Sequence, residues 1–276
     1  MQFINLYGDI ASKMDIPASD QIKVLVVDDD ELNQRMMRLI LSREGHHVHI
    51  AVNGLDAVHA VESHNFDIIL MDLQMPMMDG VEASRRIRES GDGGKNAYIV
   101  ALTASYLPEK GQELFEAGID NYIAKPFDVE HLRQMLEYGL DRRKSRKAVE
   151  TLFMNDISVP YESPDLDSKA GIMLVGGDEE TYRELLADFV DKLPEKNEMM
   201  DKYLAENDIK NLSRVAHNIK GVSSNLGALQ LYEYADKLEK ITNDSYTNES
   251  LENIVRDMKE VSRKLILDAS DFLANI

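Results

Sequence analysis

A carboxylate placed directly after an apolar run is the first feature of the sequence that could do chemistry. The run Ile68–Met71 leads into Asp72, and Pro76 follows four residues later. Four consecutive apolar residues between polar ones predict a strand buried on both faces, as in a parallel sheet, and proline ends regular pairing. Open α/β sheets carry their active sites at the carboxyl ends of strands. Asp72 is therefore predicted to lie in such a site. The hypothesis under which the rest of the chain makes sense is that it accepts a phosphoryl group.

Two further acids are predicted to lie beside Asp72. Asp28 and Asp29 follow the first strand-like segment, and in a doubly wound sheet the first and third strands are neighbours. Three converging carboxylates are costly unless a divalent cation neutralises them, and an oxygen-only ligand set favours Mg²⁺ over zinc. The alternative for the acidic pair is a helix N-cap.

Thr103 and Lys125 are predicted to complete this edge of the sheet, since they end the fourth and fifth strands. A phosphoryl group on Asp72 would have Mg²⁺ on one side and the Lys125 ammonium and the Thr103 hydroxyl on the other. Phosphoryl transfer needs mainly such positioning and charge stabilisation. Taken singly, Thr103 could be turn chemistry and Lys125 a surface charge, but five such residues at the ends of four strands favour one shared site.

The elements that must hold this site alternate between strand and helix. Strands are predicted at 23–27, 46–52, 66–71, 97–102 and 119–124, and helices at 32–40, 55–61, 81–87, 109–116 and 129–140. The predicted fold class is an α/β doubly wound five-stranded parallel sheet with right-handed crossovers. A glycine-rich stretch at 91–94 is predicted to end the third helix.

After residue 165 the strand pattern stops and amphipathic helices follow. Asp178 and the two glutamates after it are predicted to start a helix. Apolar stripes over 182–189, 212–226, 229–238 and 251–265 indicate several helices with short connections. This pattern predicts an all-α domain of the four-helix-bundle type.

One histidine lies off the apolar stripe of this second part. At 3.6 residues per turn, His217, Lys220, Gly221 and Ser224 share a face of their helix that the apolar residues do not occupy. We expect His217 to be exposed, Lys220 to neutralise phosphoryl oxygens, and Gly221 to leave room for another protein near the imidazole. A lone exposed histidine usually has no function, but this combination favours a nucleophile that is phosphorylated.

The motifs of the first part resemble those of response-regulator receiver domains. They are Val26-Val27-Asp28-Asp29, the segment 71–80 with Asp72 and Pro76, Leu102-Thr103-Ala104 and Lys125-Pro126-Phe127. The resemblance implies that Asp72 is the phosphoryl acceptor. It also implies that Asp29, Asp72 and the backbone carbonyl of Gln74 bind Mg²⁺, with Asp28 acting through water.

The same resemblance implies a switch pair in the receiver. Thr103 and Tyr122 would move together, because phosphorylation draws the hydroxyl inward and the aromatic ring follows. The alternative for Tyr122 is an aromatic residue at a strand edge with no switching role.

The segment 216–228 resembles the signature of histidine-phosphotransfer (HPt) domains. It reads Ala-His-Asn-Ile-Lys-Gly-Val-Ser-Ser-Asn-Leu-Gly-Ala, and the resemblance covers about residues 165–270, including Leu238-Glu239. It implies that His217 carries the phosphoryl group, with Lys220, Gly221 and Ser224 supporting the site. Val222 stands where a small polar residue is common in the family, a departure that does not touch the chemistry.

The predicted organisation is a leader at 1–20, which could be a short amphipathic helix, a receiver at 21–142, a linker at 143–164 and an HPt bundle at 165–276. The basic run at 142–147 is interpreted as a solvated helix end, favourable near the negative pole of the helix dipole. A nucleic-acid patch is the alternative.

Composition narrows the function classes. The chain has 276 residues, a formal net charge of −19 and no cysteine, which argues against general nucleic-acid binding, a disulfide framework and a thiolate metal site. No apolar run approaches the ~20 residues that span a bilayer, and signal-peptide features are absent. We expect a cytoplasmic protein that binds neither nucleic acid nor membrane.

Three histidines on the second predicted strand invite a metal interpretation. His46, His47 and His49 lie close together in the chain, and alternate residues of a strand share a face. A solvated strand edge is the favoured interpretation, because no carboxylate partner is obvious nearby.

The favoured function is phosphorelay signalling. Asp72 would accept a phosphoryl group from a sensor histidine kinase or an upstream HPt protein, His217 would carry one, and a downstream response-regulator receiver would take it. In the alternative, phosphorylation of Asp72 gates access to His217 through receiver–HPt contact, without direct transfer. An Asp-nucleophile phosphohydrolase is disfavoured, because its DxD-type element is not cleanly present at Asp72. No ATP-binding kinase signature is present, so we do not expect an ATP-dependent enzyme.

Overall fold

The computed structural model describes residues 21–90, 92–103, 111–125, 132–137, 139, 166–243 and 247–274. These residues form two compact units, one α/β and one helical. The predicted leader at 1–20, the linker at 143–164 and the basic run at 142–147 lie outside the described residues. No helix in these described ranges is long and apolar enough to cross a membrane.

A five-stranded sheet forms the centre of the first unit. Its strands are β1 (Lys23–Val27), β2 (His47–Ala51), β3 (Ile68–Asp72), β4 (Tyr98–Thr103) and β5 (Asn121–Ala124). Their spatial order is β2-β1-β3-β4-β5, with β1 parallel to both β2 and β3 and β3 parallel to β4. The order reverses between β1 and β3, which is where ligands bind in doubly wound sheets. The predicted fold class is confirmed.

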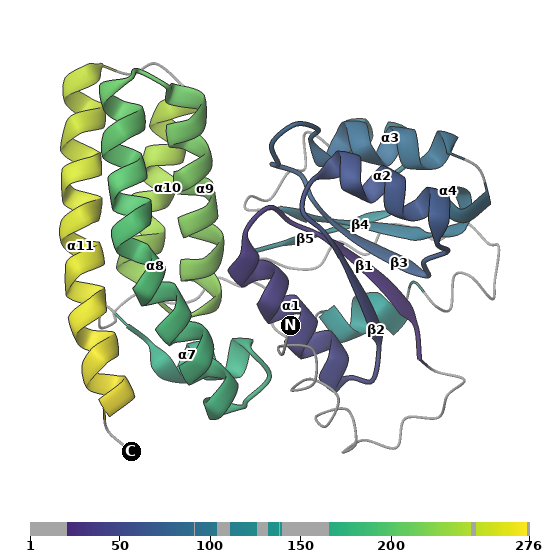
Figure 1. Cartoon of the computed structure of the whole chain (residues 1–276), viewed down its shortest axis with the longest axis horizontal. Helices are drawn as coiled ribbons and strands as arrows, with labels where there is room; N and C mark the ends of the chain where they lie inside the picture. The colour runs from purple at the N-terminus through teal and green to yellow at the C-terminus, as the bar shows by residue number, and fades with distance from the viewer. Residues whose placement is uncertain are drawn as a thin grey trace, which may run out of the picture. The chain divides into compact units, whose positions relative to one another are not determined.

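Helices cover both faces of this sheet. They are α1 (Glu31–Arg43), α2 (Gly54–Ser63), α3 (Gly80–Glu89), α4 (Asp92–Asn96) and α5 (Gly111–Glu116), and residues 132–137 are also helical. Figure 1 shows α2 and α3 on one face of the sheet and α1 on the other. Strands β3 and β4 are buried along their whole length, because both faces are covered. This double burial explains their continuous apolar sequences.

The glycine-rich stretch after α3 behaves only partly as predicted. Helix α3 ends at Glu89, but Asp92–Asn96 then form the short helix α4. The Arg88 guanidinium holds this segment by donating hydrogen bonds of 2.7 Å to the carbonyls of Gly94 and Ala97. A Cβ at Gly94 would lie 1.9 Å from the carbonyl oxygen of Ile87. Gly94 is needed for close packing against Ile87, and it does not prevent this segment from forming a helix.

The second unit is a bundle of four long helices, α8 (Glu179–Ala205), α9 (Ile209–Asn225), α10 (Leu229–Asn243) and α11 (Asn248–Ala274). Figure 1 shows them side by side. The short helix α7 (Ser168–Leu174) precedes them and was not predicted. Asp178 is the N-cap of α8, as predicted, and its side chain accepts a hydrogen bond from the backbone N–H of Glu180. The predicted helical-bundle class is confirmed.

The apolar stripe predicted for α9 forms part of the bundle core. All of its members are buried: Leu212, Val215, Ala216, Ile219, Val222 and Leu226. The hydroxyl of Tyr182 on α8 donates a hydrogen bond of 3.0 Å to the carbonyl oxygen of Leu226, at the end of α9. A buried hydroxyl needs such a partner, and this one fixes α8 against the end of the helix that carries His217.

Candidate functional site

The strand-end residues of the first unit gather at one edge of the sheet. Asp72 is the last residue of β3 and pairs with Leu102 of β4, so Thr103 lies one residue beyond. Asp28 directly follows β1, and Lys125 directly follows β5. The Asp28 and Asp72 residues are each only 2% exposed, and Thr103 and Lys125 are also buried. The topology therefore brings the predicted acceptor, acid, hydroxyl and ammonium to the carboxyl edge.

Asp28 is held by the first turn of α1. Its Oδ1 accepts hydrogen bonds from the backbone N–H of Asp30 at 2.9 Å and from Nδ2 of Asn33 at 3.2 Å. The N-cap of α1 is Asp30, whose side chain accepts from the N–H groups of Leu32 and Asn33. Asp30 therefore caps α1, so neither Asp28 nor Asp29 is the N-cap of this helix.

Asp72 is held by the loop that follows it. The backbone N–H of Gln74 donates to Asp72 Oδ1 at 2.9 Å, and that of Gly80 donates to the Leu73 carbonyl at 3.1 Å. A Cβ at Gly80 would lie 2.2 Å from the carbonyl oxygen of Asp72. The loop 73–79 thus returns to Asp72, where Asp79 caps α3.

This loop has a strained residue at Met77. Its φ is 66°, a conformation that non-glycine residues rarely adopt, and left-handed backbone costs them roughly 1–2 kcal/mol. The backbone N–H of Met78 donates to the Pro76 carbonyl at 2.8 Å. An i to i+2 hydrogen bond around a positive φ defines the strained form of the γ-turn.

The three acids do not form a ready-made metal cluster. Within the part of the chain that the structure describes, no group of three or more His, Asp or Glu side chains is arranged to hold a metal ion. A metal site that uses Asp28, Asp29 and Asp72 remains a prediction. Hydrogen bonds from Asn33 and Gln74 hold the Asp28 and Asp72 carboxylates. A metal would have to draw on fewer carboxylates, together with other oxygen atoms.

Tyr122 has features of both interpretations given to it. It lies on β5, at the edge of the sheet, but its ring is partly buried against the apolar core that includes Ile99 and Ala101. The switch role itself remains a prediction.

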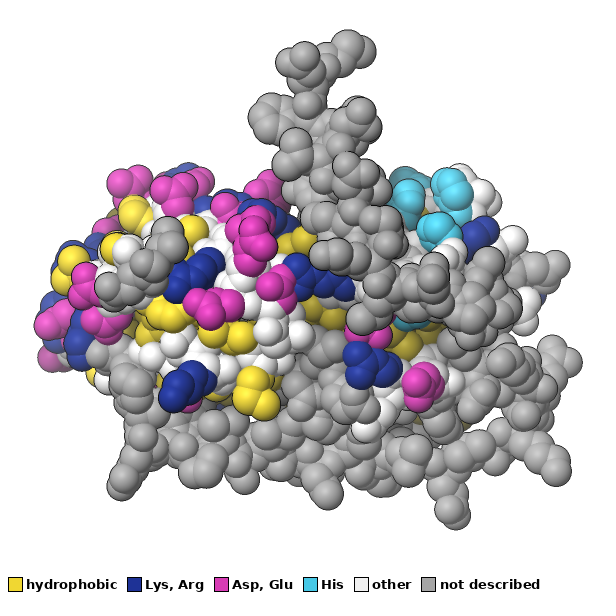
Figure 2. Space-filling view, turned by 90° about the horizontal axis from the view of Figure 1, so that it is seen from below, with side chains coloured by type: hydrophobic (Ala, Val, Ile, Leu, Met, Phe, Trp, Pro, Cys, Tyr) yellow, Lys and Arg dark blue, Asp and Glu magenta, His cyan; other side chains and the backbone are white. Residues whose placement is uncertain are grey.

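The histidines of the second strand lie at the opposite edge. Strand β2 is an edge strand, and His47 and His49 are exposed while His46 is half-buried. The solvated strand edge is confirmed, and Figure 2 shows histidine side chains gathered on the surface. The His49 ring lies 5.5 Å from that of His64 and 5.7 Å from that of Phe66, which makes an aromatic cluster.

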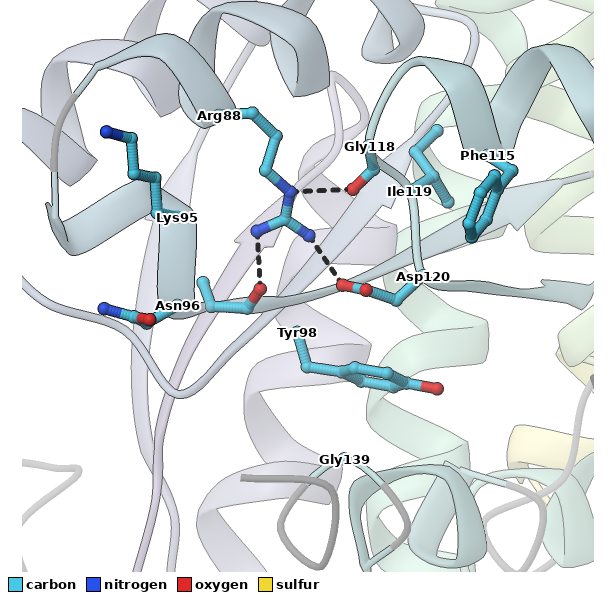
Figure 3. Close-up of a pocket in the computed structure, with 10 residues that line it drawn as sticks. Arg88, Lys95, Asn96, Tyr98, Phe115, Gly118, Ile119, Asp120 and Gly139 are labelled. Atoms are coloured by element: carbon cyan, nitrogen blue, oxygen red, sulfur yellow. Dashed lines mark hydrogen bonds and ion pairs between the residues drawn. The ribbon is translucent and has the colours of Figure 1, made fainter. Parts of the chain in front are cut away.

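A hollow of about 640 Å³ opens at the amino end of β4 and β5, away from Asp72. Figure 3 shows Arg88 reaching across it to Gly118, Ala97 and Asp120. The guanidinium is thus engaged with backbone carbonyls and a carboxylate, so we interpret it as a structural clamp between α3 and the strands.

His217 on α9 is buried, which corrects the expectation that it is exposed. The residue is 4% exposed, and its Nδ1 lies 3.0 Å from Oε1 of Glu239 on α10. Helices α9 and α10 are joined by a short turn and pack against each other, so the ring leans toward α10. Nδ1 is thus engaged by a carboxylate, and the role of His217 as a phosphoryl carrier remains a prediction.

Lys220 is paired with two acids of α10. Its Nζ lies 2.7 Å from Oδ1 of Asp236 and 3.1 Å from Oε2 of Glu239. Burial lowers the pKa of Lys220, but the two carboxylates outweigh it and raise the pKa. The positive charge of Lys220, which was expected to neutralise phosphoryl oxygens, is therefore already balanced by Asp236 and Glu239. The Ser224 hydroxyl donates to the Gly221 carbonyl at 2.7 Å, a bond within α9.

Glu239 lies in the segment that resembles HPt domains, but it was not among the predicted site residues. Burial alone would raise its pKa, but the hydrogen bond and charge of His217, together with the charge of Lys220, lower the pKa to about 2. The signal that could have found it is a carboxylate next to Leu238 at the apolar seam of α10, where it is buried. Buried carboxylates need charged or hydrogen-bonded partners.

Replacing Glu239 should change how bundle stability depends on pH. The folded pKa is about 2 against an ordinary value of 4.5, so the carboxylate contributes stability above pH ~4.5 that is lost as pH falls toward 2. We expect the native protein to lose about 3 kcal/mol over this interval through this group, and Glu239→Gln to lack that part. Urea unfolding followed by circular dichroism measures it.

The control is Glu233→Gln, which changes an exposed acid of the same helix. It should show the same acid-dependent loss as the native protein. An identical pH dependence in Glu239→Gln would contradict the assignment.

Comparisons with known proteins place both units in families. The response regulator receiver domain family matches residues 24–137, and the Hpt domain family matches residues 184–265. The chain therefore contains a response regulator receiver domain followed by an Hpt domain. No kinase domain is among the matched families.

Relatives include signal transduction histidine-protein kinase BarA of Shigella flexneri, 26% identical over 94% of this chain and 28% of that protein. Sensor protein GacS of Pseudomonas syringae pv. syringae is 29% identical over 84% of this chain and 26% of that protein. The chain thus spans less than a third of the length of these relatives. A receiver domain of sensor histidine kinase PA1611 from Pseudomonas aeruginosa PAO1, solved with magnesium in its active-site cleft, is 33% identical. It covers 44% of this chain and 98% of its own, with a TM-score of 0.41.

Proposed function

We propose that this chain relays phosphoryl groups between Asp72 and His217. Asp72 receives a phosphoryl group from a sensor histidine kinase or an upstream HPt protein, and a downstream receiver takes one from His217. The observation that carries the proposal is the 3.0 Å pair between His217 Nδ1 and Glu239. A carboxylate on Nδ1 keeps the proton on that nitrogen and raises the basicity of Nε2, which is what a histidine nucleophile needs.

The transfer step balances without any further reactant. Nε2 of His217 attacks the phosphorus of the Asp72 acyl phosphate, so an N–P bond forms while the P–O bond to Asp72 breaks. Asp72 leaves as a carboxylate, and the His217 ring gains positive charge. Nδ1 keeps its proton, and Glu239 stabilises the charged ring.

Mg²⁺ is the proposed cofactor of the receiver. The carboxylates of Asp29 and Asp72 and the backbone carbonyl of Gln74 would hold it, with Asp28 acting through water. This set uses two direct carboxylates, which suits an octahedral ion that keeps several waters and agrees with the separate anchoring of Asp28 and Asp72. Bound there, Mg²⁺ would offset the negative charge of the phosphoryl oxygens.

Other residues at the carboxyl edge of the sheet would bind the phosphoryl oxygens that Mg²⁺ does not. The Lys125 ammonium and the Thr103 hydroxyl would bind the phosphoryl group, and Tyr122 would follow the hydroxyl inward. At the HPt site, Lys220 acts through Glu239 and Asp236, while Gly221 and Ser224 shape the helix. The receiver would span 21–142 and the HPt domain 165–276, in a cytoplasmic protein that carries phosphoryl groups without using ATP.

A second candidate function is favoured by the burial of His217, which is 4% exposed. A histidine that donors and acceptors must reach is then covered, so phosphorylation of Asp72 could uncover it without passing its own phosphoryl group on. In this alternative the receiver gates the HPt domain.

Labelling with acetyl phosphate and Mg²⁺ separates the two functions. The native protein, Asp72→Ala and His217→Ala are compared for base-labile acyl phosphate and acid-labile phosphohistidine. The relay requires His217 to gain label only when Asp72 is intact, and EDTA should abolish labelling of Asp72 because the phosphoryl charge is then uncompensated. Label that reaches Asp72 and never His217 would favour gating.

A further inference from the structure

The loop that closes on Asp72 displays one large apolar side chain to solvent. Met77 is 80% exposed, whereas Met75 and Met78 beside it are each 9% exposed. Because the loop leaves Asp72 and returns to it at Gly80, Met77 borders the predicted phosphoryl acceptor.

Stability within the receiver does not explain a methionine at this position. Its positive φ belongs to the strained γ-turn at Pro76–Met78, a conformation that glycine adopts without steric cost. The side chain gains little from packing in its own domain, because it is exposed. Backbone strain of this kind is found at functional sites, and together with the exposed side chain beside the predicted acceptor it favours an intermolecular contact.

We propose that Met77 is a docking contact for the phosphohistidine-bearing helix of a donor HPt domain, and that it sets the rate of protein-to-protein transfer to Asp72. The proposal rests on the proposed function, because it needs a phosphohistidine donor. The phosphorus must come within bonding distance of Asp72. This approach brings the donor helix to the loop 73–79, in which Met77 lies five residues after Asp72. A flexible, polarisable thioether adapts to such a surface. Met77 takes no part in the chemistry, so small phosphodonors do not depend on it.

The test compares two phosphodonors on the same acceptors. The acceptor is the full chain with His217→Gln, carrying Met77, Met77→Gly, Met77→Asn or Met77→Leu. One donor is acetyl phosphate. The other is the full chain with Asp72→Ala and a mass tag, phosphorylated on His217 with phosphoramidate and then desalted. Intact mass follows the phosphoryl group, and thermal melting checks folding.

We expect Met77→Gly and Met77→Asn to slow transfer from phosphohistidine about tenfold, since they remove an apolar contact that the complex with the donor would bury. Both should leave acetyl phosphate labelling within about twofold. Leucine, which restores apolar area, should retain most of the rate. Phe115→Ser is the matched control: Phe115 is 68% exposed but lies by the hollow at the amino end of the strands, and its loss should not slow transfer.

Two results would overturn the proposal, and they differ. Equal transfer from phosphohistidine to all four acceptors would refute the role of Met77 and leave the relay intact. No transfer even to the acceptor with Met77, despite normal acetyl phosphate labelling, would refute both the relay between these sites and the docking contact.

Discussion

Asp72→Asn should abolish phosphorylation of the receiver, lowering the rate of acetyl phosphate labelling by about 100-fold or more, because an amide oxygen is a far weaker nucleophile than a carboxylate. The fold should survive the change. Asn Oδ1 can still accept the 2.9 Å hydrogen bond from Gln74 N–H, and a buried charge is removed. Intact-mass measurement of the labelled protein gives the rate.

Asp79→Asn is the matched control for this substitution. Asp79 lies in the same loop but is exposed and caps α3 by accepting from the Glu82 N–H. Asparagine caps helices as well as aspartate does, so labelling should be unchanged. Full labelling of Asp72→Asn would mean that another carboxylate is the acceptor.

Lys220→Met should strongly destabilise the HPt bundle. Its ammonium is buried, with a side chain only 3% exposed, and it compensates both Asp236 and Glu239. Removing it takes the ammonium away from the buried Glu239 and the partly buried Asp236, and breaking a buried ion pair typically costs about 3–5 kcal/mol. Urea unfolding followed by circular dichroism should show the helical transition moving to lower concentrations.

Lys240→Met tests whether the effect comes from burial or from charge alone. Lys240 also pairs with Asp236, at 2.7 Å, but its side chain is 70% exposed. Exposed ion pairs contribute less than about 1 kcal/mol, so this variant should stay close to the native stability. Similar losses in the two variants would argue against a special role for the buried ammonium.

The receiver fold and the carboxyl edge of its sheet could be predicted from the sequence, because a strand buried on both faces has an uninterrupted apolar sequence. Ile68–Met71 are apolar without interruption, and the polar residue after them marks the strand end. Parallel topology then places Asp28, Asp72, Thr103 and Lys125 at one edge without further information. What the pattern could not give is the direction of each carboxylate, which Asn33 and Gln74 set through hydrogen bonds.

The HPt site was less predictable because helical periodicity identifies a face but not the helix that lies against it. His217 falls off the apolar stripe, so the sequence suggested exposure. Its ring instead turns to Glu239, 22 residues later on a neighbouring helix. A polar contact between helices depends on side-chain rotamers and on which helices are adjacent. Neither can be inferred from the spacing of the apolar residues in one helix.

Single-turnover transfer tests most directly whether Asp72 and His217 exchange a phosphoryl group. The native chain is labelled with acetyl phosphate, desalted, and followed over time for acyl phosphate and phosphohistidine. We expect acyl phosphate to decline while phosphohistidine rises at its expense, and we expect no phosphohistidine to form in His217→Gln. Decay of the acyl phosphate to inorganic phosphate alone, with no phosphohistidine in the native chain, would contradict the relay.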